Sequence, residues 1–500
     1  MRGRAHPRSA PAIPLLLALA GTFAVACSRI PAPVRAEPSI VPEAPEASTA
    51  TGATWTYDVA ATQGGVELSI DAAFPAGPGG PLDPEIELAV GARCHPYVAD
   101  VERRVEDGWK PIERTGEAWK VPATTSGTVR IRYRFELARA ASDHDDFRVA
   151  RATGNAIEAP ASTWLLRPSK APPGTRFVLR VTSAPGDNFV TGLLQVGEDR
   201  DACGGLAADM GMLPFAAFGA LRVHELEDGA VLAAILPGKL DAEEDLLAWI
   251  RDAGRAVRGF YGRIPIPRLA VFVRPVRGSA VGFGTTMGGS GAGIAIDVGR
   301  HATRARFRDD WILVHEMTHT ALPDLGRKHH WLEEGLATYV EPIARVRAGL
   351  ISRDRLWKDW VEGMPKGEPG PGDEGLDRTH TWGRTYWGGA LFCLVADLEI
   401  RERTGGKKSL RDALLGVQRA GGDISVSWPV DRVIEAGDAA TGVPVLRETY
   451  DRMKETPVDV DLDVIWRKLG VVYENGRIAF DGSAPLASVR DEFTRANAGR

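Results

Sequence analysis

The sequence predicts an α+β protein of several domains: a β-sandwich, then a central domain that mixes strands with helices, then a mostly helical domain. Three observations support this. Short runs of alternating or β-branched residues fill 53–230, apolar residues recur with helical spacing at 240–260, and the chain beyond 350 reads as amphipathic helices. The chain has 500 residues, which exceeds what a single hydrophobic core usually organises.

These patterns divide the chain into six parts. We expect a signal peptide at 1–27 and a flexible linker at 28–52, before three domains. The expected domains are a β-sandwich at 53–230, a mixed domain of strands and helices at 231–350 and a helical domain at 351–460, and a hairpin and tail occupy 461–500.

Residues 1–27 have the pattern of a lipoprotein-type export signal. A basic start precedes the nearly continuous apolar run 12–26, which is too short to span a bilayer. The run ends in Ala24-Val25-Ala26, a small-residue cleavage site, and Cys27 follows directly. We expect acyl chains on Cys27 to anchor the mature protein at the outer membrane or cell surface. The alternative is a periplasmic or secreted protein with an odd cysteine.

Composition argues against several partners. The net charge is −5 and the isoelectric point about 6.1, with no basic run that interleaves aromatic residues, so no nucleic-acid partner is expected. Apart from the lipid on Cys27 we expect no membrane contact, and the oligomeric state stays open. Cys94 and Cys203 could pair in an oxidising compartment, whereas Cys393 lies in an apolar run and reads as a buried thiol.

The region 53–230 carries no cluster suited to catalysis. Its strand-like runs are separated by stretches rich in Gly and Pro, which favours a sandwich of short strands. His144 stands in an acidic run, 143–146, whose spacing does not close a metal site. We read that run as a solvated loop.

The next region is predicted to begin with a helix at 240–260 and a buried strand at 268–276. The stretch GFGTTMGGSGAGIAIDVG at 282–299 is rich in glycine but lacks a Gly-Lys-Ser/Thr sequence, so it does not indicate a nucleotide site. We read it as a flexible loop that leads into a strand at 292–298.

The pentapeptide HEMTH carries the main functional signal. His315 and His319 are four residues apart, so on a helix both imidazoles project from one face and can bind one Zn²⁺. Glu316 beside them is the candidate general base. Asp309 and Asp310 suit a helix start. The alternative is a pair of hydrogen-bonded core histidines.

A catalytic zinc needs a third protein ligand, and Glu334 is our candidate. It follows His319 after a turn, at the start of a second predicted helix, whereas its neighbour Glu333 should point about 100° away. His329 and His330 remain less favoured alternatives. Glu341, seven residues after Glu334, either orients a ligand imidazole or is a solvated carboxylate.

HEMTH followed by WLEEGLATY resembles the gluzincin zinc metallopeptidases, which carry HExxH and a downstream Glu in a Trp-Leu-x-Glu-Gly-x-Ala context. The resemblance implies a thermolysin-like domain with His315, His319 and Glu334 as ligands of one zinc ion. It also implies that the strand at 292–298 is an edge strand that pairs with an extended peptide.

A further match lies at 386–392, YWGGALF, where the resemblance implies that Tyr386 donates the transition-state hydroxyl; the alternative is a core aromatic residue. The domain order is similar to glycyl and alanyl aminopeptidase-like peptidases. However, the PDZ module of the former and the Gly-x-Met-Glu-Asn motif of the latter are missing, so aminopeptidase activity is open.

Beyond 350, the loop 365–375 is expected to form a flexible rim over the cleft. Arg384 either receives a substrate carboxylate or carbonyl, or is a surface charge. Asn475-Gly476 between two apolar runs predicts a β-hairpin.

These observations predict a zinc-dependent metallopeptidase that hydrolyses peptide bonds with a zinc-bound water and Glu316 as general base. Its expected partner is a peptide or protein substrate. Two alternatives stay open: a non-catalytic, zinc-containing surface lipoprotein that binds peptide or glycan, and another hydrolase on the same scaffold.

Overall fold

The computed structural model describes residues 53–75, 85–91, 93–122, 127–199 and 201–496. The predicted signal peptide, the lipid site at Cys27 and the linker lie outside these residues. In the part of the chain that is described, no helix is both long and apolar enough to cross a bilayer.

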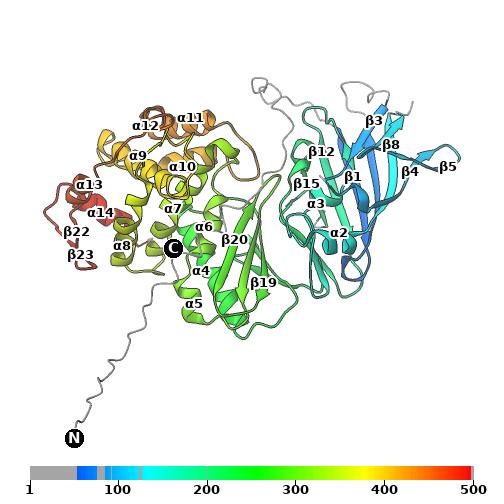
Figure 1. Ribbon diagram of the computed structural model, residues 1–500, viewed down its shortest axis with the longest axis horizontal. Helices are drawn as coiled ribbons and strands as arrows, with labels where there is room; N and C mark the ends of the chain where they lie inside the picture. The colour runs from blue at the N-terminus through cyan, green and yellow to red at the C-terminus, as the bar shows by residue number, and fades with distance from the viewer. Residues whose placement is uncertain (1–52, 76–84, 92, 123–126, 200, 497–500) are drawn as a thin grey trace, which may run out of the picture. The chain divides into compact units, whose positions relative to one another are not determined.

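The N-terminal part is rich in β-strands, as the sequence predicts (Figure 1). Its largest sheet has eight strands in the order β14 (Leu194–Gln195), β15 (Ala202–Leu206), β12 (Arg176–Thr182), β1 (Thr54–Ala61), β2 (Leu68–Pro75), β8 (Thr128–Phe135), β4 (Val98–Val105) and β5 (Gly108–Pro111). β1 pairs with β12 in parallel and with β2 antiparallel. Trp55, Tyr57 and Val59 alternate along β1 and are all buried, so one face of this sheet forms a core.

Two four-stranded sheets complete this part. One has the order β13 (Asn188–Thr191), β16 (Ala216–Gly219), β10 (Ala156–Glu158), β9 (Arg151–Thr153), and the other the order β11 (Arg167–Pro168), β3 (Glu85–Ala89), β7 (Ala118–Pro122), β6 (Arg114–Thr115). Two short helices, α2 (Leu137–His144) and α3 (Ala161–Trp164), lie between strands.

Two side chains in this part bear on predictions from the sequence. His144 ends α2 with its ring against that of Tyr97, so the acidic run is not simply a solvated loop. Cys203 is a free thiol that donates to the carbonyl of Leu179 at 3.7 Å, and burial raises its pKa to about 12.

The central sheet has five strands and differs from the prediction in one respect. Its order is β17 (Arg222–Leu226), β18 (Val231–Ile235), β19 (Leu269–Val276), β21 (Gly293–Gly299), β20 (Val281–Met287). The first part of the glycine-rich stretch is therefore a strand, β20, and β20 is the edge strand. The strand predicted at 292–298 is β21, which lies inside the sheet, so its assignment as the edge was wrong. The sheet also begins at Arg222, before the domain boundary predicted at 230.

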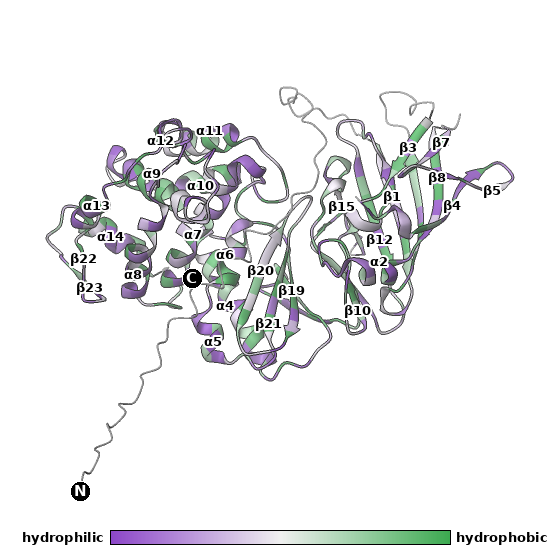
Figure 2. Ribbon diagram, viewed as in Figure 1, coloured by the Kyte–Doolittle hydropathy of each residue, from purple (hydrophilic) through white to green (hydrophobic). Residues whose placement is uncertain are grey.

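The two faces of the central sheet contact different parts of the protein. Val271, Val273 and Ile294 belong to a core shared with the helices, whereas Ala270 and Phe272 pack with residues of the β-rich part, such as Phe215. Figure 2 shows the apolar character of β19 and β21, which matches burial on both faces.

Helices make up most of the remaining chain. They are α4 (Glu243–Tyr261), α5 (Arg304–Asp309), α6 (Ile312–His319), α7 (His330–Arg347), α8 (Arg353–Gly363), α9 (Gly389–Arg403), α10 (Leu410–Arg419), α11 (Val430–Thr441), α12 (Val445–Met453), α13 (Leu462–Leu469) and α14 (Ala487–Phe493), with a π-helical turn, η6 (Arg384–Gly388), directly before α9. The helix predicted at 240–260 is α4, whose first turn carries three acidic residues and which ends at Gly262 in the left-handed conformation.

Two further sequence predictions are confirmed here. Asn475 and Gly476, both at positive φ, form the turn between β22 (Val471–Glu474) and β23 (Arg477–Phe480). Cys393 is a buried thiol on α9, and burial raises its pKa.

Candidate metal centre

The helix α6 carries HEMTH and lies in the interior. Asp310 accepts a hydrogen bond from the backbone N–H of Leu313 at 3.1 Å and so satisfies one of the free donors of the first turn. Burial raises the pKa of Asp310 to about 6, against the effect of the backbone hydrogen bonds. Both the expected acidic helix start and the buried position of His315 and Glu316 are seen.

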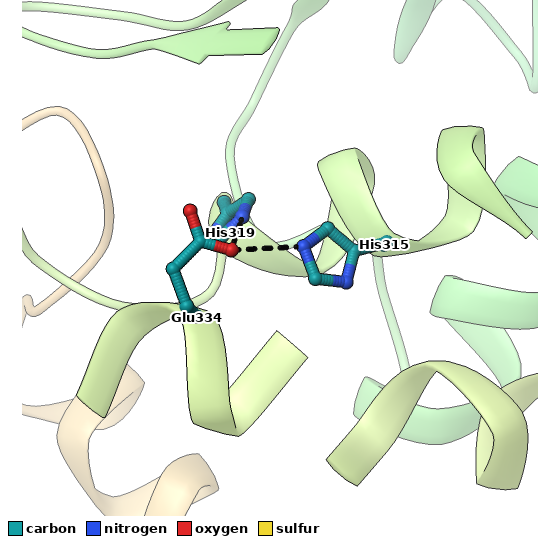
Figure 3. Close-up of side chains that lie close together, drawn as sticks. All are labelled: His315, His319 and Glu334. Atoms are coloured by element: carbon teal, nitrogen blue, oxygen red, sulfur yellow. Dashed lines mark hydrogen bonds and ion pairs between the residues drawn. The ribbon is translucent and has the colours of Figure 1, made fainter. Parts of the chain in front are cut away.

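His315, His319 and Glu334 converge on one point (Figure 3). The Nε2 of His315 lies 3.1 Å and the Nε2 of His319 lies 3.6 Å from the same carboxylate oxygen, Oε2 of Glu334. One potential ligand atom from each residue lies within 4.8 Å of the other two. Two imidazole nitrogens and one carboxylate oxygen, with a fourth position left for water, are the donor set of a catalytic zinc site. The three residues fit Zn²⁺ by number and by chemistry.

The electrostatics of the three residues favour a cation between them. Burial alone would lower the pKa of His319, but the carboxylates of Glu334 and Glu316 raise it. Burial would raise the pKa of Glu334, yet the imidazoles around it hold the pKa well below its usual range. The buried carboxylate is therefore stabilised as an anion by positive charge, which a metal ion also supplies.

Glu316 is positioned by the edge strand. The hydroxyl of Thr286, on β20, donates to Oε2 of Glu316 at 2.7 Å and lies 3.0 Å from its backbone oxygen. This contact requires β20 to run close to α6. A Cβ at Gly284 would come within 2.7 Å of Ile312 and 3.0 Å of Glu316, so a side chain at that position would push the strand away.

The neighbours of Glu334 resolve the alternatives of the sequence. Glu333 faces away from the site, as expected, and accepts from the backbone N–H of Leu325 at 2.7 Å. His330 bridges the pair, with Nδ1 2.9 Å from Glu333 and Nε2 3.2 Å from Oε1 of Glu334, the oxygen that does not face the two ligand imidazoles. Burial lowers the pKa of His330, but these two carboxylates raise it to about 10.

His329 points elsewhere and joins a buried network around Asp377. Its Nε2 lies 3.1 Å from the hydroxyl of Tyr450 and 3.5 Å from Asp377, whose carboxylate also accepts from the indole of Trp331 at 2.9 Å. Trp331 lies one turn before Glu334 on α7. The network therefore fixes the start of the helix that presents the third candidate ligand.

Glu341 is not a solvated carboxylate. Its side chain is buried and lies 2.7 Å from the guanidinium of Arg345, one turn later on α7. Burial raises the pKa of Glu341, while Arg345 and His315 act in the opposite direction. The solvated alternative is therefore wrong, and a role of Glu341 in orienting a ligand imidazole stays a prediction.

Tyr386 lies beside the candidate ligands. It belongs to the π-helical turn η6, and its ring stacks on that of His315 with centroids 6.2 Å apart. The two helices α7 and α9 pack against each other near this turn with no side chain between their backbones. A Cβ at Gly335 would come within 2.2 Å of Gly389, so α7 and α9 touch backbone to backbone next to Glu334 and η6. Tyr386 is half-buried and is not a core aromatic residue.

Arg384 and the loop 365–375 depart from the sequence interpretation. Arg384 is only 3% exposed, so it is not a surface charge, and its Nε lies 2.8 Å from the buried carboxylate of Asp373. The same guanidinium donates to the backbone oxygen of Gly367. The loop is thus held by a buried ion pair and packs under η6, in contrast to the flexible rim that was expected.

Sequence reasoning missed one residue of this site and gave a second a different role. Thr286 belongs to no motif, and a lone threonine in a glycine-rich stretch gives no signal. His330 was considered only as an alternative metal ligand, whereas the structure places it beside the outer oxygen of Glu334, four residues before it on the same helical face.

Comparisons with known proteins identify the fold. No family model and no curated protein matches the sequence. Among solved structures, an aminopeptidase N family protein from Idiomarina loihiensis is similar with a TM-score of 0.61 and 15% sequence identity, over 84% of this chain and 78% of that one. An M1 zinc metallopeptidase from Deinococcus radiodurans is similar with a TM-score of 0.51 and 14% identity, over 82% of this chain and 94% of that one. The protein therefore has the fold of these two structures.

Proposed function

We propose that the protein is a zinc-dependent metallopeptidase, with His315, His319 and Glu334 as metal ligands and Glu316 as general base. One observation carries the proposal. The donor set of a catalytic zinc site and an acid directly beside it occur together, and that acid is held by a hydroxyl from the neighbouring strand. A purely structural metal site would need neither Glu316 nor its partner Thr286.

The residues divide the chemistry between them. Zinc, when bound, supplies a Lewis acid that lowers the pKa of water and polarises a carbonyl group. Glu316 accepts the proton of the attacking water and passes it to the leaving amine. Tyr386, whose ring stacks on that of His315, donates a hydrogen bond from its hydroxyl to the oxyanion that forms on the attacked carbonyl.

The fold supports a peptide as substrate. Of the two proteins with similar folds, one is described as a member of the aminopeptidase N family and the other as an M1 zinc metallopeptidase. A further similar structure, with a TM-score of 0.50, is a variant of a two-domain M1 zinc metallopeptidase bound to L-tryptophan. The export and lipid anchoring of this chain stay predictions from residues 1–27.

The test compares wild-type protein with Glu316→Gln on a mixed peptide library, with cleavage read by mass spectrometry. The substitution keeps the size of the side chain and the metal ligands while it removes the base. We expect cleavage by wild type alone, with one zinc per chain in both proteins, and loss of zinc in His315→Ala and Glu334→Ala.

Two outcomes would contradict the proposal. Zinc in both proteins without cleavage by either would favour a binding protein or another hydrolase. A wild-type protein that cannot take up zinc would remove the metal site altogether.

A further inference from the structure

Two tryptophans beside the candidate metal centre are unusually exposed. Trp311 keeps 45% and Trp382 keeps 42% of its surface in contact with solvent. Among the described residues, the only other aromatic side chain exposed to this degree is Tyr473, at 37%, in the C-terminal hairpin. Large buried tryptophans such as Trp331 and Trp357 form the core instead. The exposure of Trp311 and Trp382 is therefore a local property of the site and not of the whole surface.

Each exposed tryptophan stands one turn before a residue of the site. Trp311 precedes His315 by four positions, and Trp382 precedes Tyr386 by four. The ring centroids lie 5.4 Å apart in the first pair and 5.9 Å apart in the second. Since Tyr386 also stacks on His315, the four rings form one continuous series that begins and ends in solvent and has a candidate zinc ligand within it.

Exposure of these two rings to water does not stabilise the fold. An indole ring carries a large apolar surface whose removal from water is favourable, so two exposed rings next to a functional site indicate a surface that a ligand covers. The rings carry no charge and offer flat apolar faces with one N–H group each. Such a surface favours apolar and aromatic groups over charged ones.

The setting favours a peptide over a glycan as the ligand. β20 is the edge strand of its sheet, and Thr286 on it contacts Glu316. An extended peptide can hydrogen-bond to such an edge through its backbone, and its side chains then alternate in direction. A side chain next to the scissile bond would thereby reach rings that contact His315 and Tyr386.

We propose that Trp311 and Trp382 bind an apolar side chain, above all an aromatic one, of a substrate residue adjacent to the scissile bond, and so determine specificity. This inference rests on the proposed metallopeptidase function for its substrate class. It assigns the two tryptophans a role in selectivity and none in the chemistry of hydrolysis.

The first measurement uses cleavage. Wild type, Trp311→Ala and Trp382→Ala are given a peptide set in which one residue on either side of the scissile bond is Phe, Leu, Ser, Asp or Lys. We expect wild type to prefer Phe and Leu over Asp by roughly 10- to 200-fold in kcat/KM, the range typical of an apolar pocket. At least one of the two variants should lose most of this preference, because its kcat/KM falls more for the Phe and Leu peptides than for the Ser and Asp peptides, while it keeps one zinc per chain.

Two controls separate specificity from stability. Trp311→Phe and Trp382→Phe retain an aromatic ring and should retain most of the preference. Trp109→Ala removes a half-buried tryptophan from β5, far along the chain in the β-rich part, and should leave the preference unchanged.

The second measurement is peptide binding by isothermal titration calorimetry, with the same peptides. It compares Glu316→Gln alone with Glu316→Gln combined with Trp311→Ala or Trp382→Ala. In one outcome, Trp311→Ala or Trp382→Ala weakens binding of the Phe peptide, but wild type cleaves no peptide. This outcome would support the aromatic site and overturn the peptidase. Cleavage by wild type with equal preference in both alanine variants would overturn the aromatic site alone. Peptides that neither bind nor are cleaved would overturn both, and binding of oligosaccharides in their place would assign the rings to a glycan.

Discussion

The hydroxyl of Thr286 donates to the carboxylate of Glu316 across 2.7 Å, from the edge strand β20 to the helix α6. A hydrogen bond to a charged group is worth about 1.5–3 kcal/mol, and here it also sets the direction of the candidate base. We predict that Thr286→Val, which keeps the shape but removes the donor, lowers kcat by about tenfold or more.

Steady-state kinetics and zinc analysis on the same samples check this prediction. Thr286→Ser, which restores a hydroxyl, should recover most of the rate. An unchanged kcat in Thr286→Val with full zinc content would show that Glu316 needs no such partner.

His330 supports the third candidate ligand through the oxygen that faces away from the imidazoles. Its Nε2 lies 3.2 Å from Oε1 of Glu334, an arrangement in which an outer residue orients a ligand. We predict that His330→Ala weakens zinc binding by about 10- to 100-fold, measured by competition with a chromophoric chelator. His301→Ala, which removes a surface histidine paired with Asp241, is the matched control and should bind zinc as wild type does. Equal affinity in both variants would exclude this role for His330.

The lowered pKa of Asp377 leads us to expect that acid destabilises the fold. Burial works to raise its pKa, but hydrogen bonds from His329, Trp331 and Tyr450, together with Lys328, lower the pKa below its ordinary value. A carboxyl whose pKa is lower in the folded state contributes stability that is complete above its unfolded pKa, at about pH 4, and that declines as the pH falls below it.

We predict that Asp377→Asn lowers the free energy of unfolding at pH 7 by about 3 kcal/mol, because it breaks a buried charged network. The difference from wild type should narrow below about pH 4. Thermal unfolding between pH 3 and 7 checks both statements. The control is Asp459→Asn, which changes an exposed aspartate. A difference that stays constant with pH would contradict the assignment of the charge to Asp377.

The glutamates of the two ligand helices leave no carboxylate for a substrate amino terminus. Glu316 is held by Thr286, Glu333 by the backbone of Leu325, and Glu341 by Arg345, while Glu334 faces the candidate metal position. We predict that acetylation of the amino terminus changes kcat/KM for a peptide by less than about tenfold, since no charge pair is lost. Matched free and acetylated peptides, compared by mass spectrometry, check this. Complete loss of cleavage on acetylation would indicate an anchoring carboxylate elsewhere in the chain.

The sequence predicted those features that are written in short, contiguous patterns. HEMTH has a fixed spacing and lies on a buried helix, and the turn at Asn475-Gly476 is specified by two residues that accept positive φ. Such features depend on local geometry, so no knowledge of the rest of the chain was needed.

The errors arose where distant segments decide the outcome. The sequence pattern indicates a loop at β20, because Gly282 and Gly284 interrupt the run of strand-forming residues. Gly284 is there because α6 passes too close for a side chain, which only the folded chain reveals. The sequence predicts Arg384 at the surface or at a substrate. No local pattern indicates that its partner is Asp373, a buried carboxylate 11 residues earlier in the chain. Thr286 acquires its importance in the same way, through a contact 30 residues along the chain.

The contact between Gly335 and Gly389 has a consequence for how this protein can diversify. The two backbones already touch, so neither position can accept a side chain without separating α7 from α9. Substitutions at Gly335 or Gly389 therefore cannot adjust the spacing between Glu334 and Tyr386 in small steps. Most of them would destabilise the fold. Exposed positions such as Trp311 and Trp382 are under no such restriction. In descendants of this chain, the reaction should stay constant while the choice of substrate drifts at the rim.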